Sequence, residues 1–141
     1  MIEIIERVVL MEFSIVDWII PIGLGLVIGI FFATRKQYDY SKIVSLNSND
    51  FAQSMRKGQL IDLRKEDLFE QGRISGARNF PKMSVFGQLH KLRKDQAVFL
   101  YDETASLLAK RVAKKLVRKG FQAVYVLEGG IKQWPFIIKN N

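Results

Sequence analysis

The pattern of apolar and polar positions divides the chain into an apolar N-terminal segment and a longer part in which short apolar runs alternate with amphipathic ones. Residues 18–33 (WIIPIGLGLVIGIFFA) carry no charge, and residues 13–16 extend the stretch across Asp17. The extended stretch has about 21 residues, and about 20 suffice for a helix to cross a hydrocarbon core of roughly 30 Å. We therefore expect a membrane anchor over residues 13–34. The tail before it, residues 1–12, shows no clear period.

Two other interpretations of the apolar segment are less favoured. A secretory signal peptide also has a compact apolar core, but here the preceding residues are acidic and no small-residue cleavage site follows. A buried helix of a soluble protein is disfavoured by Pro21 and three glycines. Gly25 and Gly29 have the GxxxG spacing, a weak indication of homo-association between membrane helices. Met1 and Met11 both remain candidate start residues.

Charge is distributed unevenly along the chain. Residues 1–34 contain one basic and four acidic side chains, so residues 35–141 hold the other 21 basic and 10 acidic ones, a net charge of +11. Arg35, Lys36 and Lys42 follow the apolar segment, against only Arg7 before it. The positive-inside rule then predicts a single-pass protein of the cell membrane, with the N-terminus outside and the rest cytoplasmic.

Beyond a linker at residues 35–42, strand-like and helix-like patterns alternate. Strands are predicted at residues 43–46, 59–63, 77–80, 97–101 and 122–127. Helices are predicted at residues 47–57, 65–71, 85–92 and 106–119, with a helical turn at 129–134. The helix at 106–119 has an apolar face and a face of lysines and arginines. This alternation predicts an α/β domain over residues 43–138, with a parallel sheet covered by helices on both faces.

The composition restricts the chemistry available to the domain. The chain contains no cysteine and a single histidine, His90, expected at the surface. Disulfides, thiolate metal sites and thiolate enzymes are thereby excluded, and we expect no metal and no cofactor. The basic residues are expected to form a solvated face, or to approach anionic lipid if the anchor is real. No nucleic-acid partner is expected, because no aromatic interleaving accompanies the charge.

Two separated motifs resemble the signatures of rhodanese domains. Residues 60–64 (LIDLR) and 72–81 (GRISGARNFP) are similar to the family's early signature, with Arg73 in place of the usual histidine and Ser75 in place of the usual proline. Gly120, Val124, the run LEGGI at 127–131 and Trp134 are similar to its late signature. The resemblance implies a rhodanese-like three-layer α/β/α fold, the fold of thiosulfate sulfurtransferases.

Most of the signature residues are expected to have structural roles. Asp62 and Arg64 can pair at the end of a buried strand. The glycines suit positions with positive φ or close approach of backbone, and Trp134 is expected to cover one end of the core. The residues assigned a structural role in this way are Asp62, Arg64, Gly72, Gly76, Pro81, Glu128, Gly129, Gly130 and Trp134.

A third segment departs from the family. In catalytic rhodaneses a cysteine ends the strand equivalent to 97–101, and a loop resembling C-x-x-G-x-R-S curls around its sulfur. The resemblance puts Asp102 at the cysteine, Ala105 at the glycine, Leu107 at the arginine and Leu108 at the serine. A carboxylate cannot carry a sulfane sulfur, and Asp102 with Glu103 would repel an anionic donor. We therefore expect no sulfurtransferase activity.

Three hypotheses follow. The first is a catalytically inactive, membrane-tethered module that binds a protein partner of unknown identity through its former active-site loop and the nearby residues 64–67 and 81–86. The loop consists of Asp102, Glu103, Thr104, Ala105, Ser106, Leu107 and Leu108. The second is non-thiol chemistry at Asp102 or Glu103, against the simpler expectation that Asp102, Thr104 or Ser106 caps the next helix. The third is support of a membrane protein through the anchor.

Overall fold

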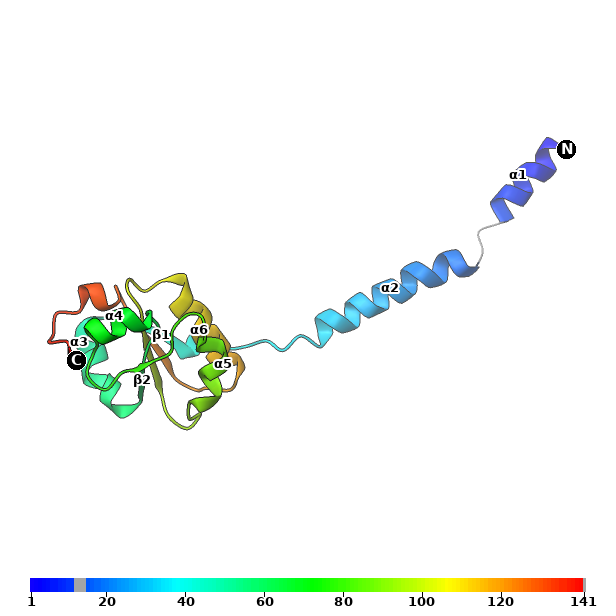
Figure 1. The fold of residues 1–141 in the computed structure, drawn as a ribbon. Coiled ribbons are helices and arrows are strands. Elements are labelled where there is room, and N and C mark those ends of the chain that lie inside the picture. Colours follow the sequence, from blue (N-terminus) through cyan, green and yellow to red (C-terminus); the bar gives the residue numbers. More distant parts are fainter. Residues whose placement is uncertain (12–14, 141) are drawn as a thin grey trace. The chain divides into compact units, whose positions relative to one another are not determined.

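The computed structural model describes residues 1–11 and 15–140 and divides into two compact units, Met1–Gln37 and Tyr38–Asn141 (Figure 1). The first unit contains α1 (Ile2–Met11) and α2 (Ile15–Ala33). The expected tail, in which we saw no period, is thus helical over Ile2–Met11. Residues 12–14, where the expected tail meets the expected anchor, lie outside the described residues.

Helix α2 is the apolar segment. It has 19 residues and a mean hydropathy of 2.3, and none of its residues is buried. By length and composition it can cross a membrane, although a signal sequence near an N-terminus has the same properties. Pro21 lies inside the helix. Among the described residues, no side chain lies within 4 Å of a Cβ placed at Gly25 or Gly29.

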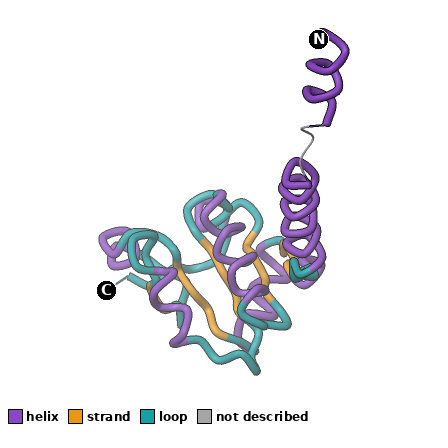
Figure 2. Tube along the Cα trace, turned by 90° about the vertical axis from the view of Figure 1, so that its right-hand side faces the viewer, coloured by secondary structure: helices purple, strands orange, loops and turns teal. Residues whose placement is uncertain are grey.

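The second unit is built on a five-stranded sheet of order β1-β5-β4-β2-β3, in which every pair is parallel. The strands are β1 (Ile43–Leu46), β2 (Gln59–Asp62), β3 (Arg78–Asn79), β4 (Val98–Tyr101) and β5 (Val124–Leu127). The helices are α3 (Ser48–Ser54), α4 (Glu66–Gln71), α5 (Val85–Gln88) and α6 (Leu107–Arg118). Figure 2 shows strands between layers of helix, which confirms the predicted α/β/α fold.

Side chains alternate across the sheet and form two cores. Val98 and Leu100 of β4 face the core that includes α5 and α6. Phe99 and Tyr101 face the opposite core, where Phe51 of α3 packs edge-on against Phe99 with ring centroids 5.5 Å apart. All four residues of β4 are buried, as expected for the central strand of a parallel sheet.

The structure refines two predicted helices. The helix expected at 47–57 has Asn47 as its N-cap, where the Asn47 side chain accepts a hydrogen bond from the N–H of Asp50, and ends in a 3-10 turn, Met55–Lys57. The helix expected at 85–92 is α5 followed by a 3-10 turn, Leu89–Lys91.

The folded unit is longer at both ends than residues 43–138. It begins at Tyr38, and a 3-10 turn over Tyr40–Lys42 leads directly into β1. At the other end, Arg73 and Lys139 form an antiparallel bridge, with backbone N···O distances of 2.9 and 2.7 Å. Part of the expected linker therefore belongs to the domain.

Candidate functional site

The candidate site is the loop between β4 and α6, at the carboxyl end of the sheet where open parallel sheets bind ligands. Ser106 is the N-cap of α6, and its Oγ accepts a hydrogen bond from the N–H of Leu108. Among the three caps that the sequence left open, Ser106 therefore caps the helix directly. Asp102 accepts a hydrogen bond from the N–H of Ser106 and so holds the cap residue in place, whereas Thr104 is exposed.

Asp102 is buried inside this loop, with 4% of its surface exposed. Its Oδ2 accepts a hydrogen bond from the N–H of Ser106 at 2.8 Å and another from the Ser106 hydroxyl. Its Oδ1 is buried without a hydrogen-bond partner in the described part of the chain, as is Oε2 of Glu103. The carboxylate of Asp102 thus occupies the inside of the loop and is hydrogen-bonded to Ser106 of the same loop.

The turn after β5 supports the loop from behind. The carbonyl of Asp102 accepts from the N–H of Ile131 at 2.9 Å, and that of Glu103 accepts from the N–H of Lys132 at 3.2 Å. Gly130 has φ +64°, and a Cβ there would lie 2.5 Å from backbone atoms of Glu103 and Thr104. The late signature motif therefore shapes the loop through backbone contact.

Ala105 is the one described non-glycine residue with positive φ, at +56°. It occupies the position where the resemblance places a glycine. The left-handed conformation brings Cβ too close to the following carbonyl oxygen in L-residues. Alanine therefore holds here a conformation that glycine adopts most easily.

This strain gives a test. The Ala105→Gly variant is expected to raise the free energy of unfolding by about 0.5–1 kcal/mol, because relief of the left-handed strain exceeds the added flexibility of the unfolded chain. The matched control is Ala109→Gly inside α6, which should lower it by about 1 kcal/mol or more. Urea titration measures both. A lower stability of the first variant would contradict the assignment of strain to this residue.

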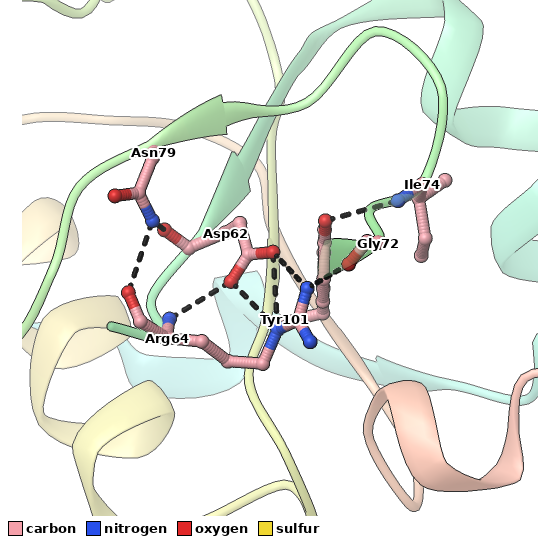
Figure 3. Close-up of polar contacts among 6 residues, drawn as sticks. All are labelled: Asp62, Arg64, Gly72, Ile74, Asn79 and Tyr101. Atoms are coloured by element: carbon pink, nitrogen blue, oxygen red, sulfur yellow. Dashed lines mark hydrogen bonds and ion pairs between the residues drawn. The ribbon is translucent and has the colours of Figure 1, made fainter. Parts of the chain in front are cut away.

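A buried ion pair holds the neighbouring strand ends, as predicted for Asp62 and Arg64. Nη2 of Arg64 lies 2.7 Å from Oδ2 of Asp62 and 2.6 Å from the carbonyl oxygen of Gly72 (Figure 3). The Arg64 side chain is 7% exposed and that of Asp62 is fully buried. Nδ2 of Asn79 donates to the carbonyls of Asp62 and Arg64 at 3.3 and 3.0 Å. The pair therefore connects β2, β3 and the segment around Gly72.

Tyr101 completes this network at the end of β4. Its hydroxyl accepts from the N–H of Ile74 at 3.2 Å. Burial, followed by the charge of Asp62, raises the pKa of Tyr101 well above its ordinary value, so the hydroxyl stays protonated. Burial is the largest single effect on Arg64 and disfavours its charged form, but the hydrogen bonds and the charge of Asp62, with smaller contributions from Tyr101 and Glu103, together exceed it and raise the pKa of Arg64. The charge of Arg64 is thus engaged by Asp62.

Other signature residues have the expected structural positions. Gly72 has an extended φ of 173°, and a Cβ there would lie 2.8 Å from Cδ1 of Ile138, the movable end of a half-exposed side chain. Trp134 packs edge-on against Phe51, with ring centroids 6.1 Å apart. Gly76 and Gly129 stand at turns with positive φ, +86° and +72°. The carbonyl of Pro81 accepts a hydrogen bond from the N–H of Val85, and the N–H of Glu128 donates one to the carbonyl of Leu46.

A pocket of about 330 Å³ opens beside the loop. The loop contributes Asp102, Glu103, Ser106 and Leu108, and the predicted neighbouring segments 64–67 and 81–86 contribute Arg64, Lys65 and Lys82. Leu63 and Leu68 complete the walls and were not anticipated, because their role depends on how α4 packs beside β2. Leu107, which stands at the family's arginine position, points to solvent and is 70% exposed.

No metal-binding arrangement occurs within residues 1–11 and 15–140, where three or more His, Cys, Asp or Glu side chains never gather closely enough to hold an ion. His90 is exposed, as predicted, and its Nδ1 lies 2.7 Å from the carbonyl oxygen of Gly87. Among the described residues that line the pocket beside the loop, the acidic ones are Asp102 and Glu103.

Comparison with known sequences agrees with these features. The sequence profile of the rhodanese-like domain family matches residues 47–135. The uncharacterized protein YqhL of Bacillus subtilis (strain 168) is 36% identical over 102 residues, covering 72% of this chain and 80% of that protein. The uncharacterized protein YibN of Escherichia coli (strain K12) is 33% identical over 79 residues, covering 53% of this chain and 54% of that protein.

Solved structures share the fold. A rhodanese-related protein of Thermoplasma volcanium aligns with a TM-score of 0.64 at 18% identity, covering 70% of this chain and 99% of that one. A rhodanese-like domain protein of Staphylococcus aureus aligns with a TM-score of 0.61 at 17% identity, covering 70% and 98%. These identities establish the fold alone. With the sequence match over residues 47–135, they show that the chain belongs to the rhodanese-like domain family.

Proposed function

We propose that this protein is a membrane-tethered rhodanese-like domain that does not transfer sulfur and that binds a protein partner through the loop of residues 102–108. The observation that carries the proposal is the carboxylate of Asp102, which accepts the N–H and the hydroxyl of Ser106 inside the loop. Sulfur transfer needs a nucleophilic thiolate. In this loop the N–H of Ser106 already donates its hydrogen bond to the carboxylate of Asp102.

The charges around the loop support the same conclusion. Asp102 and Glu103 bring two carboxylates to the place where an anionic sulfur donor would bind, and like charges repel. Arg64, which lines the pocket together with Asp102 and Glu103, is held by Asp62 at 2.7 Å. Leu107 contributes no compensating charge. The pocket beside the loop remains open and has mainly apolar walls with Lys65 and Lys82 near it, which suits binding of a side chain from a partner.

The membrane tether rests on α2. Its 19 residues and mean hydropathy of 2.3 meet the requirement for a spanning helix. Arg35 and Lys36 follow it directly, so the positive-inside rule favours a cytoplasmic domain and an external N-terminus. The domain would then display its loop at the inner face of the cell membrane.

The sulfurtransferase assay is the first test. The full-length chain in neutral detergent, supplied with thiosulfate and cyanide, is expected to form thiocyanate no faster than a buffer blank, because no thiolate is available. Turnover clearly above the blank that disappears in the Asp102→Ala variant would refute the proposal. A chain purified with a contaminating sulfurtransferase would show turnover that the substitution leaves unchanged.

The binding role needs its own measurement. Glu103, Thr104 and Leu107 are at least partly exposed and can be replaced together by alanine. Proteins that co-purify with the full-length chain and are lost with this triple variant, but kept with an alanine triple on the exposed residues Gln53, Lys57 and Lys94, would be loop-dependent partners. Equal recovery with both triples would contradict a binding role for the loop.

A second candidate function is non-thiol chemistry at the same carboxylates. The observation in its favour is that Oδ1 of Asp102 and Oε2 of Glu103 are buried without hydrogen-bond partners in the described residues, beside the pocket. A nucleophilic carboxylate needs a second positioned group or a metal. Trapping of an acyl-phosphate with a chemical phosphate donor, lost in Asp102→Asn, would favour this function over the first.

A further inference from the structure

A second surface of the domain is defined by the side of α6 that faces away from the sheet. The helix buries Ala109, Val112, Ala113, Leu116 and Val117. Its other side and C-cap carry only basic charge, and every one of these side chains is exposed: Lys110, Arg111, Lys114, Lys115, Arg118 and Lys119. We call these six residues the basic face. Within the described chain none of the six is paired with a carboxylate.

Spacing makes the basic face electrostatically unfavourable by itself. Lysines and arginines recur three and four residues apart along α6, where side chains on a helix are neighbours and like charges repel. Only the last of them gain from the carbonyl end of the helix. A surface of opposite charge would relieve this repulsion over the whole length of the helix, about 18 Å for its 12 residues.

The chain leaves the domain on this same face. Nε of Arg118 donates to the hydroxyl of Tyr40 at 2.9 Å, and Nζ of Lys114 lies 5.7 Å from the centre of the Tyr40 ring. The guanidinium of Arg118 lies 5.8 Å from the centre of the Tyr38 ring. Contacts of this kind between cations and aromatic rings are attractive. Tyr38 and Tyr40 therefore hold the start of the domain against the C-terminal half of α6.

Chain length then limits how far this face can be from the end of α2. Tyr38 follows Ala33, the last residue of α2, by five positions. Five extended residues span at most about 17 Å. If α2 crosses a membrane, Tyr38 lies within that distance of the end of the spanning helix, and the guanidinium of Arg118 is 5.8 Å from the centre of its ring. Arg35 and Lys36 lie in between and add two further positive charges.

The opposite end of α6 has exposed apolar side chains. Leu107 and Lys82 line one hollow together with Arg111. Met83, next to Lys82, is 95% exposed, and Phe86 is exposed as well. Basic side chains mixed with exposed apolar ones are typical of surfaces that rest in the headgroup region of a bilayer.

We infer that the basic face, with Leu107 and Met83 at its end, docks on anionic lipid headgroups of the membrane that α2 spans. The inference rests on the anchor in the proposed function. Anionic headgroups match the charge of the six side chains, and the tether raises their local concentration. The loop of residues 102–108 runs into the first turn of α6, so docking would bring it to the height of the membrane surface. An acidic protein partner is the competing occupant.

The test uses the full-length chain in nanodiscs. Because the chain has no cysteine, single dyes can be attached at Lys119→Cys on the basic face and, as a control, at Gln53→Cys on α3 across the sheet. Nitroxide-labelled headgroups report proximity to lipid. Quenching of the Lys119 dye is expected to rise when phosphatidylglycerol replaces part of the phosphatidylcholine. It should fall again at about 0.5 M NaCl, where charges are screened within about 4 Å.

Charge variants make the test specific. Lys110→Gln, Arg111→Gln and Lys115→Gln together should lower the docking equilibrium constant by about 100-fold, given roughly fivefold for each basic residue near the surface. The matched control neutralises Lys57, Lys94 and Lys139, which are exposed outside α6. Equal effects of the two triples, or quenching that does not depend on phosphatidylglycerol, would overturn the inference and leave the face to an acidic protein.

Insertion is measured separately in the same samples. Chain that stays in the discs through alkaline carbonate extraction, in both lipid compositions, has an inserted α2. If the chain is inserted but the Lys119 dye is not quenched, the docking inference fails and the anchor stands. If the chain is extracted, the anchor itself fails. The two failures therefore give different results.

Discussion

Replacing Arg64 by alanine is expected to lower the free energy of unfolding of the domain by about 3–5 kcal/mol, because it leaves the carboxylate of Asp62 buried without its counter-ion. Asp62 is fully buried, and Arg64 also holds the carbonyl of Gly72 at 2.6 Å. Since about 1 kcal/mol moves the midpoint of a domain this size by 4–8 °C, a loss of more than roughly 10 °C is expected. Thermal unfolding followed by circular dichroism measures it.

The control is a second arginine–aspartate pair with the same spacing. Nη2 of Arg93 and Oδ2 of Asp95 are also 2.7 Å apart, but both side chains are largely exposed. Exposed pairs contribute little to stability, so Arg93→Ala should leave the midpoint almost unchanged. If the two variants lose similar stability, burial is not what makes the Asp62–Arg64 pair important, and the structural role assigned to it is wrong.

The Gly130→Ala variant is expected to destabilise the domain by roughly 3–5 kcal/mol, through a backbone conformation open only to glycine and a steric clash. Gly130 has φ +64° and ψ −166°, and the new Cβ would lie 2.5 Å from the backbone of Glu103 and Thr104. The loop must move to accommodate it. Chemical denaturation gives the stability, and amide shifts of Glu103 and Thr104 report the movement.

Variants at two further glycines distinguish the effect of backbone strain on stability from the effect of the steric clash. Gly76 has φ +86° but no atom within 4 Å of a Cβ, so Gly76→Ala should cost about 1 kcal/mol from strain alone. Gly87 lies in α5 without positive φ and with open space around it, so Gly87→Ala should be neutral or stabilising by up to about 1 kcal/mol. Equal losses at Gly130 and Gly76 would show that contact with the loop is unimportant.

The strands and the longest helix were predictable because their patterns are local. The apolar run at 97–101 gives the fully buried β4, and the 3.6-residue period at 106–119 gives α6. The order of the strands in the sheet was harder to predict from the sequence. Nothing local indicates that β1 lies beside β5 at one edge, since pairs such as Ile43 and Val124 are 81 positions apart. The contacts of Tyr40 with α6 are similarly remote, so those residues were assigned to a linker.

The candidate site was predictable in part for the same reason. The Asp62–Arg64 pair spans two residues and was expected from sequence. The cap of α6 stayed open among Asp102, Thr104 and Ser106, because all three residue types cap helices well. In the structure Ala105 adopts a left-handed conformation and the next residue, Ser106, is the cap. An alanine in the sequence gives no sign of that conformation. The walls of the pocket, such as Leu68, depend on tertiary packing.

The curl of the loop depends largely on backbone. Its carbonyls at Asp102 and Glu103 are held by the N–H groups of Ile131 and Lys132, and Gly130 lies directly against it. None of these contacts involves a side chain of the loop, and inside the loop only Asp102 and Ser106 add side-chain hydrogen bonds among the described residues. The exposed side chains Thr104 and Leu107 can therefore change while the shape persists. In design terms, Gly130 and the two backbone hydrogen bonds are a fixed frame, and Thr104 and Leu107 are the positions on it that are open to exchange.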